Sequence, residues 1–149
     1  MNNLIDEVAL YYSRKLAEHG ATPHGVDWNG EASQELRFAQ LAQIVEPGRP
    51  YSVNDLGCGY GALFDFLRRR PDALDYCGID VSAEMVDAAQ ARYLDQPSAR
   101  FITASTPDRP ADYGIASGIF NVRQERSDEE WRAYIVVVLG SLDNTSCRG

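Results

Sequence analysis

The sequence has few cysteines, only one lysine and no long apolar run. Its three cysteines, Cys58, Cys77 and Cys147, are widely spaced and form no C-x-x-C pair, so neither a disulfide framework nor a zinc site is predicted. A reducing, cytoplasmic location is the expected compartment. Lys15 is the only lysine among 14 basic residues, and the others are arginines, a bias that favours a bacterial source with GC-rich coding DNA.

Membrane and nucleic-acid partners are both disfavoured. The longest apolar run, residues 135–139, is far shorter than the ~18 residues that a membrane span needs. The first residues have no basic start and no apolar stretch, so no signal peptide is expected. Acidic residues outnumber basic ones by 22 to 14, and the resulting net charge of −8 repels a phosphate backbone.

Hydrophobic spacing predicts an α/β fold within the 149 residues. Two helices come first and end at Gly20 and before Pro47. Short strands then alternate with helices, and the strands are expected at 51–56, 76–80, 100–103 and 113–117. Such alternation predicts a parallel, Rossmann-like sheet whose ligand binds at the carboxyl ends of the strands. A capping box at Ser127 and Glu130 opens a last helix, whose apolar stripe is expected in the core.

The turn after the first strand is rich in glycine. Gly57, Gly59 and Gly61 alternate there, and glycine allows positive φ and close approach of the backbone to a ligand. Asp55 precedes this loop, and Asp80 ends the second strand, where a carboxylate can accept both hydroxyls of a ribose. Asp55 would repel a pyrophosphate, so a cationic nucleoside is favoured. A nicotinamide-dependent oxidoreductase domain stays an alternative.

These motifs resemble those of one enzyme family. Residues 55–63, DLGCGYGAL, resemble the first motif of the class I S-adenosylmethionine-dependent methyltransferases, and residues 78–82, GIDVS, resemble the second. Residues 111–120 resemble the fourth-strand motif, so the resemblance spans about residues 50–125. It implies S-adenosylmethionine as cofactor, no metal, and methyl transfer to an unidentified small-molecule acceptor.

The resemblance also implies a set of binding residues. The residues implied to bind the cofactor are Asp55, Gly57, Cys58, Gly59, Gly61, Asp80, Val81, Met85, Ser105, Ser117 and Gly118. To these we add Arg37 as a hypothetical partner of the cofactor carboxylate. Substrate contacts are expected from Tyr11, Trp28 and Asn121, with Tyr12 as a further aromatic residue of a lid. Residues 1–48 are expected to form this helical lid, and residues 49–149 the cofactor-binding domain. No catalytic residue is assigned.

The sequence departs from the family in two places. Members that methylate bases or amides often carry an Asn/Asp-Pro-Pro-aromatic motif after the fourth strand, but residues 117–120 read SGIF, so exocyclic amino methylation loses support. About four of the seven family strands are present, which favours a fragment over a naturally minimal enzyme. The fourth strand would then be an exposed edge, open to pairing in a homo-oligomer. A non-catalytic, cofactor-binding fragment stays an alternative.

Overall fold

The computed structural model describes residues 2–123 and 125–149. Its elements, in chain order, are α1 (Asn2–His19), η1 (Pro23–Val26), α2 (Glu31–Leu41), η2 (Ala42–Ile44), β1 (Tyr51–Leu56), α3 (Ala62–Leu67), β2 (Leu74–Asp80), α4 (Ala83–Arg92), β3 (Ala99–Thr103), β4 (Tyr113–Ala116) and α5 (Asp128–Asn144). None of these described helices is long and apolar enough to cross a membrane.

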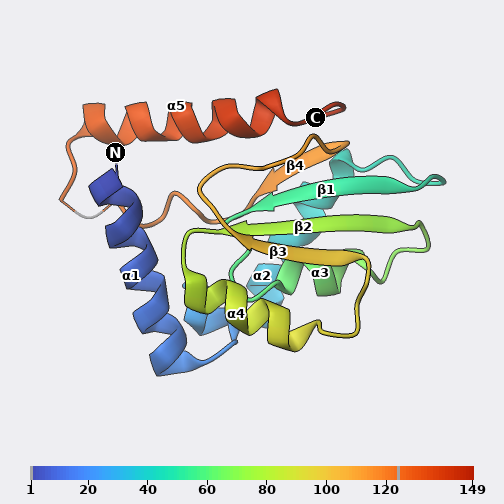
Figure 1. The fold of residues 1–149 in the computed structure, drawn as a ribbon, viewed down its shortest axis with the longest axis horizontal. Coiled ribbons are helices and arrows are strands. Elements are labelled where there is room, and N and C mark those ends of the chain that lie inside the picture. The colour runs from blue at the N-terminus through green and yellow to red at the C-terminus, as the bar shows by residue number, and fades with distance from the viewer. Residues whose placement is uncertain (1, 124) are drawn as a thin grey trace.

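The four strands form one parallel sheet in the order β3-β2-β1-β4. The chain moves outward from β1 to β2 and β3, and then returns to the other side of β1 for β4, so the strand order reverses between β1 and β4. Figure 1 shows α2, α3 and α4 on one face of the sheet and α5 on the other. The predicted α/β, Rossmann-like fold is confirmed.

Apolar side chains bury both faces of the sheet, as expected for parallel strands covered by helices. Beneath α2 to α4, the side chains of Val53, Phe64 and Tyr76 are fully buried. On the opposite face, Leu56 and Ile79 belong to a smaller cluster; its further buried members are Cys77 and Leu142. Alternating positions of one strand therefore serve two cores, which fixes which side chains of β1 and β2 face each helix layer.

The expectation that the apolar stripe of α5 belongs to the core is largely wrong. Leu142 is buried, but Trp131 and Tyr134 are only half-buried and Leu139 is 48% exposed. The reason is the position of the helix. It packs on the sheet through Val138 and Leu142 near its C-terminal end, while its N-terminal part extends past the sheet toward α1 (Figure 1).

The outer edge of β4 is not open in the way that the sequence suggested. Residues 145–149 run beside it, and Ala111 forms an isolated parallel bridge with Ser146. The amide of Ala111 donates to the Thr145 carbonyl, and the amide of Cys147 donates to the Ala111 carbonyl, each at 2.8 Å. The prediction of a bare edge is therefore wrong over this stretch, because the end of the chain occupies it.

Local signals predicted two helix starts correctly. The Ser82 hydroxyl accepts the amide of Met85 at the start of α4, and Ser127 and Glu130 form a complete capping box at the start of α5. Ser82 also connects the sheet to the N-terminal helix. Its hydroxyl lies 2.9 Å from that of Ser13 on α1, and the Ser13 hydroxyl donates to Glu84 at 2.7 Å. These contacts hold α1 beside the start of α4.

Candidate functional site

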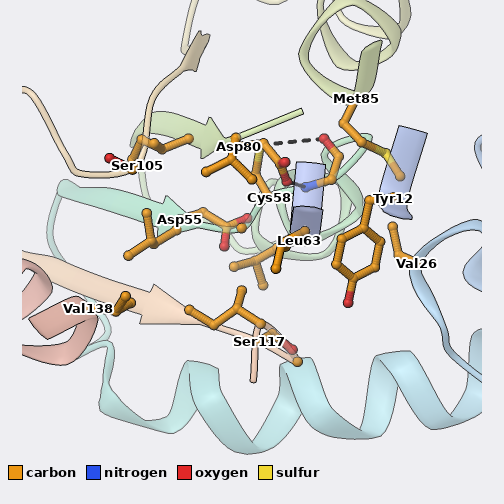
Figure 2. A pocket seen from close by; sticks show the side chains of 18 of the residues that line it. Tyr12, Val26, Asp55, Cys58, Leu63, Asp80, Met85, Ser105, Ser117 and Val138 are labelled. Carbon is orange, nitrogen blue, oxygen red and sulfur yellow. Dashed lines mark hydrogen bonds between the residues drawn. The ribbon is translucent and has the colours of Figure 1, made fainter. Parts of the chain in front are cut away.

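A cavity opens at the carboxyl ends of β1, β2 and β4, where the strand order reverses. The cavity volume is about 170 Å³. Figure 2 shows Asp55 and Asp80 at the ends of neighbouring strands, with Tyr12 and Val26 on the right and Ser117 and Val138 below.

Asp55 is a buried carboxylate on the cavity wall. It ends up there because β1 carries it at the last position but one, on the same face as Val53. The Tyr76 hydroxyl donates to it from the neighbouring strand β2. Burial, together with the smaller effect of the nearby Asp80 and against the opposing Tyr76 hydrogen bond, raises the pKa of Asp55 to about 7. A cation beside Asp55 would relieve this cost of burying charge.

Asp80 organises the loop that surrounds it. One carboxylate oxygen accepts the Gly59 amide at 2.8 Å, and the other accepts the Ser82 amide at 2.9 Å. Burial raises the pKa of Asp80, and these backbone hydrogen bonds oppose that rise. The carboxylate thus joins the glycine loop to the start of α4. A carboxylate has about four acceptor positions, so Asp80 can still accept from the hydroxyls of a ligand.

Two loop glycines bring backbone close to neighbouring walls. Gly57 has φ +79°, and a Cβ there would lie 2.0 Å from Ile119 Cγ2. Gly59 has φ +53°, and a Cβ there would lie 2.9 Å from Val26. Both conformations disfavour any residue with a side chain, and both positions lack the space for one. The sequence therefore needs glycine here for the loop to form a floor under the cavity.

The structure brings most of the predicted cofactor residues together on this wall. The predicted residues that line the cavity are Trp28, Asp55, Gly57, Cys58, Gly59, Asp80, Val81, Met85, Ser105, Ser117 and Gly118. Tyr12, the further aromatic residue expected in the lid, also lines it. Cys58 is buried, and burial raises the pKa of its thiol well above the ordinary value, which disfavours a thiolate nucleophile.

Four predicted residues lie elsewhere. Gly61 is buried against Tyr93 and Phe101, so its positive φ serves the turn and the core packing. Arg37 is exposed, and its guanidinium lies over the Trp28 ring, 5.6 Å from the centroid. Tyr11 packs edge-on against Tyr12. Asn121 is exposed at the surface. Arg37 and Tyr11 thus contact aromatic residues of the cavity wall without lining the cavity themselves.

Sequence reasoning expected the first helix in a lid but missed its apolar cavity residues and the whole contribution of α5. The missed residues are Ile5, Val8, Tyr134, Val137, Val138 and Ser141. The α5 residues follow one another at i, i+3, i+4 and i+7, which places them on one face of a helix. Tyr134 and Ser141 are polar residues within this stripe, and they were the available signal that it lines a cavity. The apolar stripe alone is equally typical of core packing. Tyr76, the partner of Asp55, was also missed.

The residues of the cavity fit a cationic nucleoside ligand. Two buried acids face it and none of the described residues that line it is basic, so positive charge is favoured near Asp55. The Ser117 hydroxyl is buried and finds no hydrogen-bond partner in the described part of the chain, which leaves a polar group for a ligand. Within residues 2–123 and 125–149, no group of three or more His, Cys, Asp or Glu side chains could hold a metal ion.

Sequence comparisons point to one kind of protein. Residues 53–139 match the family model described as "Methyltransferase domain". A Mycobacterium tuberculosis protein named as a methyltransferase is 53% identical over 107 residues, which are 72% of this chain and 64% of that protein. The trans-aconitate 2-methyltransferase of Pseudomonas aeruginosa is 36% identical over 70 residues, which are 42% of this chain and 25% of the relative.

A solved structure shows the same fold. The S-adenosylmethionine-dependent methyltransferase of Geobacter sulfurreducens, solved with S-adenosylhomocysteine, gives a TM-score of 0.53 at 17% identity. The match covers 74% of this chain and 43% of that one. The chain thus spans less than two thirds of the length of each of these proteins.

Proposed function

Because this chain belongs to the methyltransferase domain family, we propose that it binds S-adenosylmethionine in the cavity at the ends of β1, β2 and β4 and serves methyl transfer to a small-molecule acceptor. When bound, this cofactor supplies a methyl group on a positively charged sulfur. The transfer is an in-line displacement from an activated leaving group, so the protein contributes mainly position and electrostatics. A non-catalytic, cofactor-binding fragment is the second candidate, because the chain spans only part of its relatives.

The observation that carries this proposal is the pair of buried acids beside the glycine loop. Asp80, with both oxygens fixed by backbone amides, would accept the ribose hydroxyls. Asp55, whose burial disfavours its charge, would gain a cationic partner in the cofactor ammonium. Val81 and Met85 would flank the adenine, and Ser105 would lie near its amine. The Asp55 carboxylate also makes a pyrophosphate-bearing nicotinamide cofactor a poor alternative.

The N-terminal helices would act as a lid in this proposal. Residues 1–48 would cover the cofactor, and Trp28 of this segment already lines the cavity. Arg37 would have to leave the Trp28 ring to reach a carboxylate, so its cofactor role is a separate hypothesis. A cytoplasmic, bacterial setting also stays a prediction. Self-association through the β4 edge would require residues 145–149 to leave that edge.

The relatives do not identify the acceptor. The Pseudomonas relative is named for trans-aconitate, which carries three carboxylates. No lysine, arginine or histidine is among the described residues that line the cavity of this chain. We therefore do not propose trans-aconitate as the acceptor.

Calorimetric titration of the 149-residue chain with S-adenosylmethionine and S-adenosylhomocysteine tests the proposal. We expect micromolar binding, lost in Asp80→Ala and kept in Asp75→Asn, a matched acid at the other, exposed end of β2. Far-UV circular dichroism of each variant reports whether it is folded. A folded wild-type chain that binds neither compound would refute the proposal.

A further inference from the structure

The outer side of α5 carries a strip of side chains that the described part of the chain leaves largely uncovered. Val136 is 62% exposed and Leu139 is 48% exposed, and Arg132 and Asp143 are exposed on the same side of the helix. In Figure 1, α5 runs along the outside of the molecule. The cavity is lined from the opposite side of this helix, for example by Tyr134. The strip is therefore a surface separate from the cavity.

The spacing of these residues is that of a helix-pairing seam. Glu129, Arg132, Val136, Leu139 and Asp143 follow one another at intervals of three, four, three and four residues, which is the alternation of the a and d positions in a coiled coil. All five are exposed. They form one line along about 21 Å of the helix, at 1.5 Å per residue. The apolar middle and the charged ends of the strip can therefore face one partner helix at the same time.

The charges of the strip are complementary to those of a second, antiparallel copy. Neither Arg132 nor Asp143 takes part in an ion pair within the described part of the chain. In an antiparallel pair centred between Val136 and Leu139, Arg132 of each copy faces Asp143 of the other, and Val136 faces Leu139. A parallel pair would instead bring each of these charges against its own kind, which is repulsive. Two-fold symmetry makes every favourable contact occur twice.

The expected association is weak. Burying the exposed parts of Val136 and Leu139 from both copies is favourable by about 25 cal/mol for each Å² removed from water. The strip, about 21 Å by about 10 Å, is small against the ~800 Å² that each partner buries in a standard interface. The net charge of −8 on each chain opposes contact, although salt at ~0.15 M screens charges farther apart than ~8 Å. A dimer of this kind forms only at high protein concentration.

We propose that this strip is a homodimer contact, in which the α5 helices of two copies pack antiparallel through Val136 and Leu139 and pair Arg132 with Asp143. The proposal goes beyond the proposed function and does not depend on it, because the cavity is lined from the other side of α5. It also leaves in place residues 145–149, which occupy the outer edge of β4. The surface between two copies is therefore a helix pair and not a continued sheet.

Sedimentation of the full chain without ligand, at concentrations up to about 1 mM in about 0.15 M salt, tests the proposal. We expect a reversible monomer–dimer equilibrium. Leu139→Lys should weaken the dimer about tenfold or more, because each dimer would then place two ammonium groups in its apolar middle. Leu94→Lys is the matched control, since Leu94 is 82% exposed after the end of α4, and it should change the dimerisation constant by less than about twofold.

A charge exchange tests the antiparallel arrangement. Arg132→Asp and Asp143→Arg should each weaken the dimer about fivefold or more, because each turns two attractive pairs into two repulsive ones. The double variant exchanges the partners and should return to within about threefold of the wild type. Arg14→Asp, the same charge change at an exposed position of α1, is the control and should have the smaller effect of net charge alone.

The substituted positions are suited to this test. Both charged residues are exposed, and Asp143→Arg puts a cation in the last turn of α5, where the helix dipole favours it. Far-UV circular dichroism checks that each variant is folded. A chain that stays monomeric at the highest concentration would overturn the proposal. A dimer that ignores Leu139→Lys, or a double variant that fails to recover, would equally overturn it, since the contact would then lie on another surface or run in another direction.

Discussion

Asp55 gives the sharpest test of the electrostatics derived from the structure. Its carboxylate is buried, and its pKa rises from an ordinary 3.8 to about 7. In the folded chain the group therefore keeps its proton at pH values where the unfolded chain has already lost it. Stability contributed by Asp55 must then fall as the pH rises from about 4 to about 7, and stay low above that.

The size of this effect follows from the same numbers. A difference of about three pKa units at about 1.36 kcal/mol each gives an upper bound of about 4 kcal/mol. Asp55→Asn keeps an oxygen that can accept from the Tyr76 hydroxyl and removes the ionisation. We expect the unfolding free energy of the variant to exceed that of the wild type by about 1 kcal/mol near pH 4.5 and by about 2–4 kcal/mol at pH 8.

Urea denaturation without ligand, followed by far-UV circular dichroism at several pH values, measures this difference. Asp80 is also buried with a raised pKa and makes stability fall with pH in the same direction. Because the two carboxylates interact, the difference between wild type and variant reports Asp55 together with its coupling to Asp80. Asp95→Asn, at an exposed carboxylate, is the control and should not change the slope. A gap between wild type and Asp55→Asn that is constant from pH 4.5 to 8 would refute the reasoning.

Four further changes test the packing of the fold. Ser13→Ala removes the hydroxyl that links α1 to Ser82, and should weaken S-adenosylhomocysteine binding about two- to tenfold and speed amide exchange in α1, as expected for one lost hydrogen bond. Gly57→Ala should lower the free energy of unfolding by roughly 1–3 kcal/mol, because its φ is +79° and Ile119 occupies the Cβ position. A Cβ at Gly140 on α5 meets open space, so Gly140→Ala should instead raise the free energy of unfolding by about 1 kcal/mol. Urea denaturation compares the two variants. Deletion of residues 145–149 breaks four backbone hydrogen bonds, three to Ala111 and Asp112 just before β4 and one to Gly114 within it. It should cost about 2 kcal/mol and increase self-association, measured by denaturation and sedimentation.

Much of the fold was determined by local signals in the sequence. The strand at Tyr51–Leu56, the glycine turn, the Ser82 cap and the capping box at Ser127 depend on residues within a few positions of one another. Backbone conformation and capping are local, and so sequence spacing predicts them directly. The end of β2, and with it the position of Asp80, was predicted on the same grounds.

What surrounds the cavity was decided by contacts between distant segments. Spacing on α5 shows that Tyr134, Val138 and Leu142 share a helix face, but it does not show which parts of that face meet the sheet and which meet an empty space. The Tyr76 hydroxyl reaches Asp55 because β1 and β2 are paired in a particular register. Neither result follows from periodicity.

The sequence by itself therefore determined the elements, the parallel sheet and the two acids beside the glycine loop. Only the tertiary structure decided that α5 lines the cavity, that Gly61 belongs to the core, and that residues 145–149 cover the edge of β4. The physical reason is that secondary structure is stabilised by neighbours along the chain. Burial, in contrast, depends on which segments meet after the chain has closed on itself.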